Sequence, residues 1–315
     1  MDFLNIRYVK LRFVLGFLED ATLPVYKTST IRGGIGEMFM RQHCINQRIC
    51  DKKEQICEYA RECIVQRMMY ASPGSLRPEF MGTGDSVGYV IECTDGRTNF
   101  PKDSTLSFQL LLFGKNIVYF NEYLQAIHLL GAEGLGKEEA KYRIEGIFNQ
   151  KGESLLSGNH ILLDVYRAEF VSDYAARRRE ELLQMGNSYQ IQFKSPVSIK
   201  YRGEFIRTFQ ENALKESLLR RIYILNCFEG RTEKLPEPDA EFPLIISQDV
   251  RWKEIPRYSF RNQEKIRLKG ILGTICVKDV SEEWLTLLCA GELIHIGKSV
   301  TFGFGQYRVT ENINI

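Results

Sequence analysis

The stretch that decides the fold is His295-Ile296-Gly297-Lys298-Ser299-Val300-Thr301-Phe302-Gly303-Phe304-Gly305-Gln306-Tyr307-Arg308-Val309, near the end of the chain. Its glycines let backbone approach a ligand closely, while a lysine adds charge and a histidine stands just ahead of them. Gly-rich loops of nucleotide-binding proteins open a helix whose N-terminus receives the phosphate. This loop instead enters an alternating, aromatic and β-branched segment typical of a strand. The context excludes Walker-type and dinucleotide-binding motifs and leaves a phosphate-handling loop of another kind.

The composition is that of a soluble globular protein. The chain has 315 residues, enough for two domains of ordinary size, with 44% hydrophobic and 26% charged residues. The formal net charge is only +2, so a site for a polyanion must come from local clustering of basic side chains. No segment approaches the roughly 20 apolar residues that span a bilayer, and no apolar signal segment opens the sequence. We therefore expect a cytoplasmic protein without membrane contacts.

Residues 1–150 predict the element order β-α-β-β-α-β of a ferredoxin-like unit. Alternating apolar and basic residues over 9–15 indicate the first strand, and Thr28 begins a set of N-cap hydroxyls before a helix. The remaining elements are predicted as strands over 89–93 and 106–113, a helix over 117–130 and a strand over 142–148. A cysteine-rich insertion, about residues 44–85, follows the first helix.

The same order returns in the second half of the sequence. Residues 151–186 are interpreted as an insertion or linker, whose helix around 177–183 predicts a solvated face of self-paired arginines and glutamates. Residues 187–315 then form a second ferredoxin-like domain. Its elements are predicted as a strand over 190–201, a helix over 208–225, strands over 250–259 and 265–277, a helix over 281–290 and a strand over 304–309. We expect an α+β fold of two tandem ferredoxin-like (RRM-like) domains, with the Gly-rich loop before the last strand.

Several segments resemble the CRISPR-associated endoribonucleases that cut the repeat transcript into guide RNAs (Cas family six, RAMP class). The terminal glycine loop is the strongest match: that family's loop is commonly written G-x-G-x5-G-x-G, and here His295 stands in the place of the first glycine. Other similar segments are Lys27-Thr28-Ser29-Thr30-Ile31-Arg32-Gly33-Gly34-Ile35-Gly36, Leu112-Phe113-Gly114, Ser195-Pro196-Val197-Ser198-Ile199-Lys200, Arg220-Arg221 and Arg257-Tyr258-Ser259.

The resemblance implies tandem ferredoxin-like domains, CRISPR repeat RNA as substrate, and cleavage without a metal ion. In such cleavage the 2′-hydroxyl beside the scissile phosphate attacks, leaving a cyclic phosphate and a 5′-hydroxyl. The protein must take one proton, donate another and stabilise charge. Histidine suits the proton transfers, while lysine, arginine and backbone amides suit the charge.

The sequence holds four histidines, of which two are candidate catalytic residues. His128, within an apolar helix segment, is interpreted as structural, and His160 lies in the insertion without supporting neighbours. His43 ends the first predicted helix, where the family often keeps a catalytic histidine, and His295 enters the glycine loop. Each has a structural alternative, since His43 also suits a helix C-terminus or a metal cluster and His295 a hydrogen-bonded turn. Tyr26 and Lys27, just before the helix, are weaker catalytic partners.

Candidate RNA-binding residues supply charge, close backbone approach or a ring for stacking. Arg220 and Arg221 are adjacent on a helix and point different ways, so at most one of them is expected to face RNA. The alternative interpretation of each basic residue is an ordinary surface charge with no role in binding. The candidates are Arg32, Arg257, Tyr258, Arg261, Gly297, Lys298, Gly303 and Gly305.

Four of the eight cysteines, Cys44, Cys50, Cys57 and Cys63, fall within twenty residues. Four thiolates can enclose zinc tetrahedrally, although this spacing is longer than usual. A structural zinc site and reduced, packed cysteines both remain open. No cofactor is expected for catalysis.

Two functions fit the sequence. The first is a metal-independent endoribonuclease that cleaves CRISPR precursor RNA into guide RNAs, and the histidine beside the loop favours it. The second is a non-catalytic RAMP-type RNA-binding subunit of a CRISPR effector complex. Expected partners are repeat RNA and either other CRISPR-associated proteins or a second copy of the chain.

Overall fold

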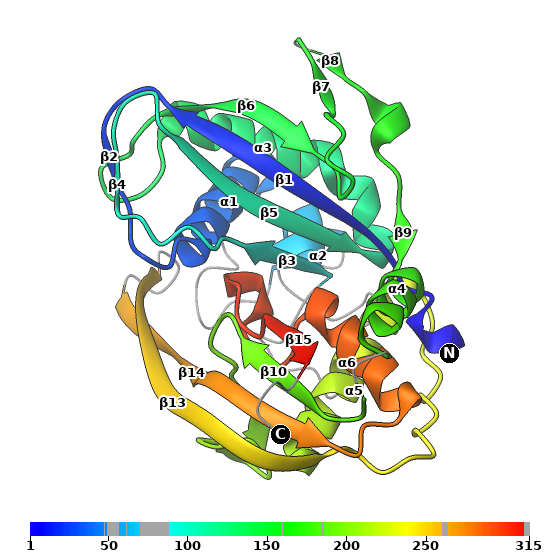
Figure 1. Cartoon of the computed structure of the whole chain (residues 1–315). Coiled ribbons are helices and arrows are strands. Elements are labelled where there is room, and N and C mark those ends of the chain that lie inside the picture. The colour runs from blue at the N-terminus through cyan, green and yellow to red at the C-terminus, as the bar shows by residue number, and fades with distance from the viewer. Residues whose placement is uncertain are drawn as a thin grey trace.

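A computed structural model of the chain describes residues 1–46, 48, 57–60, 62–69, 88–158, 160–183, 186–259 and 264–311. It shows an α+β protein with two main antiparallel sheets, one from each half of the sequence (Figure 1). Within the described ranges, no helix combines the length and the apolar character needed to cross a membrane.

The first sheet has the strand order β3-β5-β1-β6, with a short strand β9 beside β1. Helices α1 and α3 cover one of its faces (Figure 1). The predicted strands and helices of this half are all present, with slightly different ends. The elements are η1 (Asp2–Leu4), β1 (Arg7–Phe17), β2 (Ala21–Thr22), α1 (Thr28–His43), α2 (Ile64–Met69), β3 (Tyr89–Glu92), β4 (Asn99–Phe100), β5 (Thr105–Phe113), η3 (Gly114–Tyr119), α3 (Phe120–Glu133) and β6 (Tyr142–Phe148).

The segment interpreted as an insertion or linker contributes several elements to the fold. It holds a small hairpin, the strand β9 and the helix α4, and α4 packs against α6 of the second half. Glu180 and Glu181 are exposed and Glu181 pairs with Arg178, as the predicted self-paired face implies, but Arg178 itself is buried, because its guanidinium also pairs with Glu292 of α6 at 3.0 Å. The elements are β7 (Leu156–Ser157), β8 (His160–Ile161), η4 (Leu163–Val165), β9 (Glu169–Phe170) and α4 (Val171–Leu183).

The second sheet has the strand order β13-β14-β10-β15. Its strands β13 and β14 form a long hairpin whose free end reaches toward the first half (Figure 1). Residues 190–201, predicted as one strand, divide into β10 and the start of a small separate ribbon. The elements are β10 (Tyr189–Phe193), β11 (Lys200–Tyr201), β12 (Glu204–Phe205), α5 (Glu211–Glu229), β13 (Leu244–Ser259), β14 (Glu264–Lys278), α6 (Glu282–Ile294), η5 (Val300–Phe302) and β15 (Tyr307–Glu311).

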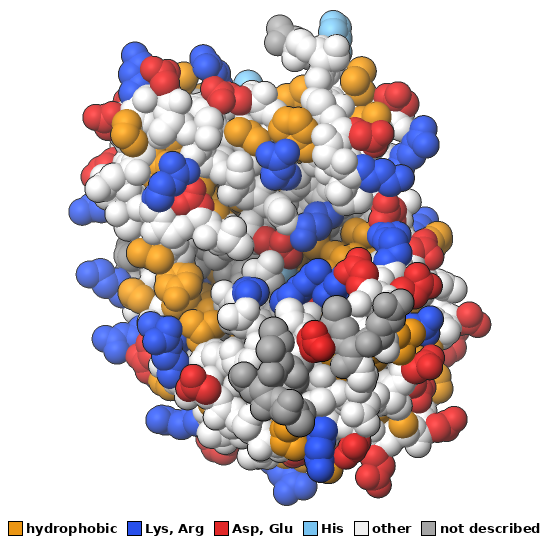
Figure 2. Space-filling model, viewed as in Figure 1, with side chains coloured by type: hydrophobic (Ala, Val, Ile, Leu, Met, Phe, Trp, Pro, Cys, Tyr) orange, Lys and Arg blue, Asp and Glu red, His pale blue; other side chains and the backbone are white. Residues whose placement is uncertain are grey.

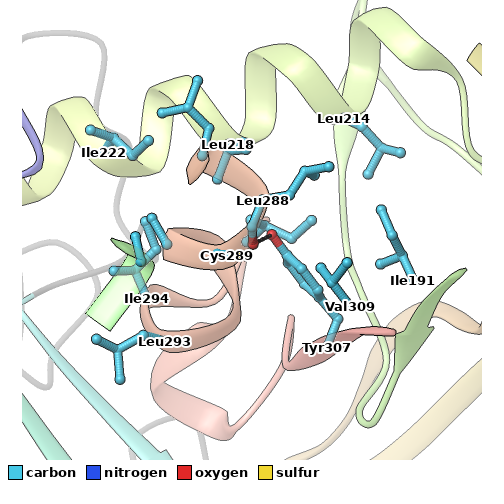
Figure 3. Close-up of a cluster of buried hydrophobic side chains, with 14 of the residues drawn as sticks. Ile191, Leu214, Leu218, Ile222, Leu288, Cys289, Leu293, Ile294, Tyr307 and Val309 are labelled. Carbon is cyan, nitrogen blue, oxygen red and sulfur yellow. Dashed lines mark hydrogen bonds between the residues drawn. The ribbon is translucent and has the colours of Figure 1, made fainter. Parts of the chain in front are cut away.

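The core of the second half lies between the sheet and helices α5 and α6. Leu214, Leu218 and Ile222 recur every four residues on α5 and form its buried stripe. Figure 3 shows Tyr307 of β15 reaching into this core, where its hydroxyl donates to the Leu288 carbonyl oxygen at 2.7 Å. The hydrogen bond satisfies a phenol that would otherwise be costly to bury. It also ties the strand that follows the glycine loop to the helix that precedes it.

Glu292 is the buried charge at the centre of the contact between α4, α6 and β15. Its carboxylate accepts from Arg178, from Arg308 at 3.0 Å, from the Tyr174 hydroxyl at 2.9 Å and from the Val309 amide at 2.6 Å. The side chain of Glu292 is 1% exposed, so these bonds replace its lost hydration.

Replacing Glu292 with Gln should destabilise the protein by roughly 3 kcal/mol, because it removes the buried counter-charge of Arg178 and leaves only the pair with exposed Glu181. Urea unfolding at neutral pH measures the change. The matched control is Glu180→Ala, an exposed position on α4, which should shift the free energy of unfolding by less than about 0.5 kcal/mol. Equal stability of the Glu292→Gln variant and the parent would contradict this account.

Candidate functional site

The glycine loop links α6 to β15 and folds tightly on itself and on neighbouring backbone. Gly297, Gly303 and Gly305 have φ angles of +81°, +78° and +80°, which favour glycine. A Cβ at Gly305 would lie 2.0 Å from the Ile296 carbonyl oxygen, so a larger residue does not fit. The glycines therefore allow close packing of backbone against backbone.

Two of the predicted phosphate-binding amides are already engaged. The Gly303 amide donates to the Val300 carbonyl oxygen and the Gly305 amide to that of Pro196, both at 2.9 Å. Because an amide donates one hydrogen bond, neither is available to a phosphate in this conformation. Gly303 and Gly305 thus have a structural role in the loop, and their contact with RNA stays a prediction.

His295 is fully buried at the start of the loop. Its Nδ1 lies 2.9 Å from the Phe304 carbonyl oxygen and its Nε2 lies 2.9 Å from Oε1 of Glu92. Its backbone has φ +61° and ψ 162°, a conformation that costs a non-glycine residue on the order of 1–3 kcal/mol. Glycine would adopt it freely, which explains why the family pattern has glycine here. In this chain the two side-chain contacts offset the strain.

Glu92, at the end of β3, joins the two halves of the protein through buried polar contacts. One carboxylate oxygen faces His295 and the other accepts from Lys10 of β1 at 2.9 Å. Burial alone raises the pKa of Glu92, but the Lys10 charge and the His295 hydrogen bond outweigh it and leave the pKa at about 2. The imidazole is thus enclosed between the sheets rather than exposed to a substrate. This placement favours a positioning role for His295, and its catalytic assignment stays a prediction.

Phe302, within η5, lies between basic residues from both halves of the chain. The guanidinium carbons of Arg32 on α1 and Arg257 on β13 lie 4.5 Å and 4.3 Å from its ring centroid. The Thr28 hydroxyl holds the same turn by donating to the Phe302 carbonyl oxygen at 2.6 Å. We call Arg32, Phe302 and Arg257 the junction site. The structure therefore brings together two predicted RNA-binding residues that are far apart in the sequence.

The junction site has an excess of positive charge. Burial, and next the charge of Arg32, lower the pKa of Arg257 to about 10. Within the described residues, no carboxylate shifts the pKa of Arg257, and its buried Nε atom has no hydrogen-bond acceptor. A phosphate would supply both charge and acceptors there. Figure 2 shows basic and acidic side chains interspersed over the face in view, so anion binding depends on such local pairs.

Lys298 and Gly297 have different neighbours from Phe302. Both line a pocket that is also lined by Arg220 and Arg221. Both arginines line this pocket, Arg221 as a buried residue and Arg220 as an exposed one, and the expectation that at most one of them faces RNA stays a prediction.

The four predicted catalytic residues lie in separate places. Lys27 is 1% exposed, and its ammonium group donates to the backbone carbonyl oxygens of Asp95 and Arg97, so it is engaged in holding that turn. Tyr26 is 38% exposed near the start of α1. His43 is half-buried at the other end of this helix, about 22 Å away along its axis at ~1.5 Å per residue. Tyr26 and His43 therefore lie at opposite ends of α1, and the catalytic assignments stay predictions.

Other predicted residues are only partly covered by the structure. Arg261 lies outside the described residues, and only the backbone of Tyr258 is placed, in β13. Cys50 is also outside them, and among the described residues no three His, Cys, Asp or Glu side chains gather as a metal site would require. Cys44 and Cys57 each accept a hydrogen bond, from the Arg48 amide and the Asn46 amide nitrogen. The zinc site stays a prediction.

Sequence reasoning missed Glu92, Lys10 and Phe302. Glu92 is the single charge that ends a buried apolar strand, and Phe302 is the aromatic residue before Gly303 in the loop. Both signals are weak, because neither residue type implies a partner from a distant segment.

Comparison with known protein families covers most of the chain. The model of the CRISPR-associated endoribonuclease Cas6 family matches residues 191–307, and a model described as an N-terminal domain matches residues 5–171. An Archaeoglobus fulgidus protein, described as uncharacterized, is 21% identical over 294 residues, covering 91% of this chain and 92% of its own.

Solved Cas6 structures share the fold. Thermus thermophilus Cas6 has a TM-score of 0.50 at 12% identity, with 97% of this chain and 99% of that chain covered. A partial Cas6-RT-Cas1–Cas2 complex has a TM-score of 0.57 at 14% identity; the match covers 98% of this chain but only 47% of the other, so this chain spans about half of that protein's length. The family-model match makes residues 191–307 similar to the CRISPR-associated endoribonuclease Cas6, and these solved Cas6 structures share the fold of the chain.

Replacing Glu92 with Gln should reduce stability in a pH-dependent way. The folded-state pKa of about 2 lies below the usual 4.5, so the stabilisation is complete above about pH 5 and is lost as the pH falls toward 2. At ~1.4 kcal/mol per pKa unit, its size is on the order of 3 kcal/mol. Urea unfolding of both proteins between pH 7 and pH 2.5 should show the difference shrinking with acid. The exposed control Glu204→Gln should show no such trend, and a difference independent of pH would refute the assignment.

Proposed function

We propose that this chain binds CRISPR repeat RNA at the junction site and cleaves the precursor transcript into guide RNAs without a metal ion. The observation that carries the proposal is the pairing of Arg32 and Arg257 around Phe302. The family match supports the substrate class, and one solved relative is a Thermus thermophilus Cas6. Cleavage by attack of the 2′-hydroxyl needs charge stabilisation and proton transfer, and the junction site supplies the first.

Arginine is suited to this task because its planar guanidinium donates two parallel hydrogen bonds to a phosphate. Arg32 comes from α1 and Arg257 from the hairpin, so a phosphate bound by both would hold the two halves of the protein together. Phe302 keeps both guanidinium groups near its ring through cation–π contacts. The site is therefore preorganised, and the protein does not have to order it when RNA binds.

For proton transfer we propose Tyr26 and His43 as separate candidates. Tyr26 is exposed near the same end of α1 as Arg32, where its hydroxyl could protonate the leaving 5′-oxygen. His43 has a buried Nε2 atom without a hydrogen-bond partner among the described residues. Their separation along α1 means that a single scissile phosphate would use one or the other.

We also infer that the two halves are tandem ferredoxin-like domains. Each follows the order β-α-β-β-α-β, and each sheet places its first strand between its third and fourth strands. The proposed arrangement puts the glycine loop between the last helix and last strand of the second domain.

The second candidate function is a non-catalytic RNA-binding subunit of a CRISPR effector complex. The observation that favours it is the dispersal of the four catalytic candidates, with His295 and Lys27 buried and bonded. Under this alternative the junction site binds RNA, but no discrete product forms.

Replacing Arg32 or Arg257 with Ala should weaken binding of repeat RNA about tenfold, because each change removes a charged hydrogen-bond donor to phosphate. It should also lower the slope of log affinity against log salt concentration by ~0.7. Filter binding at several salt concentrations measures both. Arg251→Ala, on the exposed part of β13, is the matched control and should change affinity less than twofold. Unchanged affinity in both variants would contradict RNA binding at the junction site.

Cleavage of end-labelled repeat RNA in EDTA should yield discrete products with a 2′,3′-cyclic phosphate end. His43→Ala and Tyr26→Phe test the proton donors and acceptors, and the residue in use should lose about 10²–10⁴-fold in cleavage rate with RNA affinity retained. His295→Gln should lower the urea concentration at the midpoint of unfolding, because His295 is expected to position the loop. Tight RNA binding with no cleavage by the parent protein would support the non-catalytic alternative.

A further inference from the structure

A second basic site lies in the C-terminal half, apart from the junction site. It is a pocket of about 380 Å³ between α5, the segment before and within the β11–β12 ribbon, and the start of the glycine loop. This volume falls at the lower end of the roughly 300–1,000 Å³ of small-molecule sites. The residues that line it are Ser198, Ile199, Lys200, Tyr201, Gly203, Ala213, Glu216, Ser217, Arg220, Arg221, Ile224, Gly297 and Lys298.

The fold builds this pocket from a separate stripe of α5. Leu214, Leu218 and Ile222 point into the core toward α6 and β10 (Figure 3). The pocket-lining residues Ser217 and Arg221 are spaced four apart and lie on a neighbouring stripe of the same helix. One face of α5 thus packs the core, while another forms the pocket wall.

The glycine loop closes the pocket at a fixed position. The Lys298 amide donates to the Ser198 carbonyl oxygen at 2.7 Å, and a Cβ at Gly297 would lie 2.5 Å from the same oxygen. Glycine is therefore required for this close approach. As a result, the Lys298 side chain is anchored at the pocket by a backbone that cannot easily shift.

Cationic side chains dominate the pocket. Among the described residues that line it, Lys200, Arg220, Arg221 and Lys298 are cationic and Glu216 is acidic. Arg221 is 2% exposed, and its Nε donates to the Ile294 carbonyl oxygen at 3.0 Å, so its guanidinium has a defined orientation. Burial lowers the pKa of Arg221 to about 9, and a bound anion would offset that cost.

The pocket is more than an anion site, because it also offers apolar surface and a hydrogen-bond acceptor. Ile199, Ala213 and Ile224 provide apolar wall, and Tyr201 adds a ring. A nucleotide combines the matching parts, which are a phosphate, an apolar base face and a polar base edge. Inorganic phosphate would use only the cationic part.

We propose that this pocket binds a single guanosine nucleotide of the RNA, with its phosphate on the cationic wall and its base edge on Glu216. The assignment rests on the proposed RNA-binding function and specifies a nucleotide that the junction site does not read. A carboxylate favours guanine, because the guanine Watson–Crick edge presents two adjacent N–H donors. The corresponding edges of adenine, cytosine and uracil place an acceptor beside each donor.

The first test uses the intact protein and free nucleotides. Calorimetric titration with GMP, AMP, CMP and UMP should give tightest binding for GMP, and inorganic phosphate should bind at least tenfold more weakly. Lys298→Ala should weaken GMP binding about tenfold, the expected loss for one charged hydrogen-bond donor. Glu216→Gln should remove the preference for GMP over AMP while AMP binding is retained. Lys215→Ala, next to Glu216 on α5 but outside the pocket lining, is the matched control and should change nothing.

The second test uses RNA, to separate a free nucleotide ligand from a nucleotide within the chain. Repeat RNA transcribed with inosine in place of guanosine lacks the base amino group and should bind less tightly to the parent but equally well to Glu216→Gln. The proposal is overturned if Glu216→Gln loses the preference for GMP while the parent binds inosine RNA as tightly as guanosine RNA. That result would assign the pocket to free nucleotides. Equal binding of all four nucleotides, or of GMP and phosphate, would also overturn it.

The two proposals fail in different ways. If the proposed RNA function is wrong, repeat RNA does not bind to the parent protein, although GMP titration can still detect the pocket. If only the pocket assignment is wrong, the parent binds repeat RNA, and Arg32→Ala and Arg257→Ala weaken that binding. Glu216→Gln then has the same relative affinity for guanosine RNA and inosine RNA as the parent.

Discussion

The buried contact between His295 and Glu92 joins the two halves of the protein within a shared hydrophobic core. The imidazole belongs to the glycine loop, the carboxylate to β3, and Lys10 of β1 completes the group. Each of these polar side chains would be costly to bury alone, so they constrain one another to a single arrangement. Because His295 also accepts a strained backbone conformation, the loop is fixed both by its side chain and by its glycines. Such a fixed loop can hold functional side chains in place.

The two basic sites follow from that rigid loop. Phe302 is held by Thr28 and gathers Arg32 and Arg257, while Lys298 is anchored to Ser198. A chain with a net charge of +2 can bind a polyanion in this way without a generally basic surface. Under the proposed function, the loop would contribute to binding by placing side chains, since the amides of Gly303 and Gly305 donate to backbone carbonyl oxygens within the protein.

The order and type of the elements could be predicted well from local patterns. Alternation and helical spacing located β1, α1, β5 and β6 within a few residues, because these patterns depend only on neighbours in the chain. The same reasoning missed the burial of one arginine within residues 151–186. Arg178 belongs to a charged run that has the composition of a solvated helix face, yet its partner Glu292 is 114 positions away. No local pattern can show that a single arginine of such a run is buried.

By itself, the sequence determined that the chain alternates strands and helices in two similar halves, that its glycine loop lies between a helix and a strand, and that it resembles the CRISPR endoribonucleases. Only the tertiary structure decided what the key side chains do. His295 and Glu92 are 203 positions apart, and so the enclosure of the imidazole could not be inferred from the residues around it. The same holds for the meeting of Arg32 and Arg257 at Phe302. Periodicity reports which face of an element is apolar, whereas burial and hydrogen-bond partners depend on which distant segment packs against it.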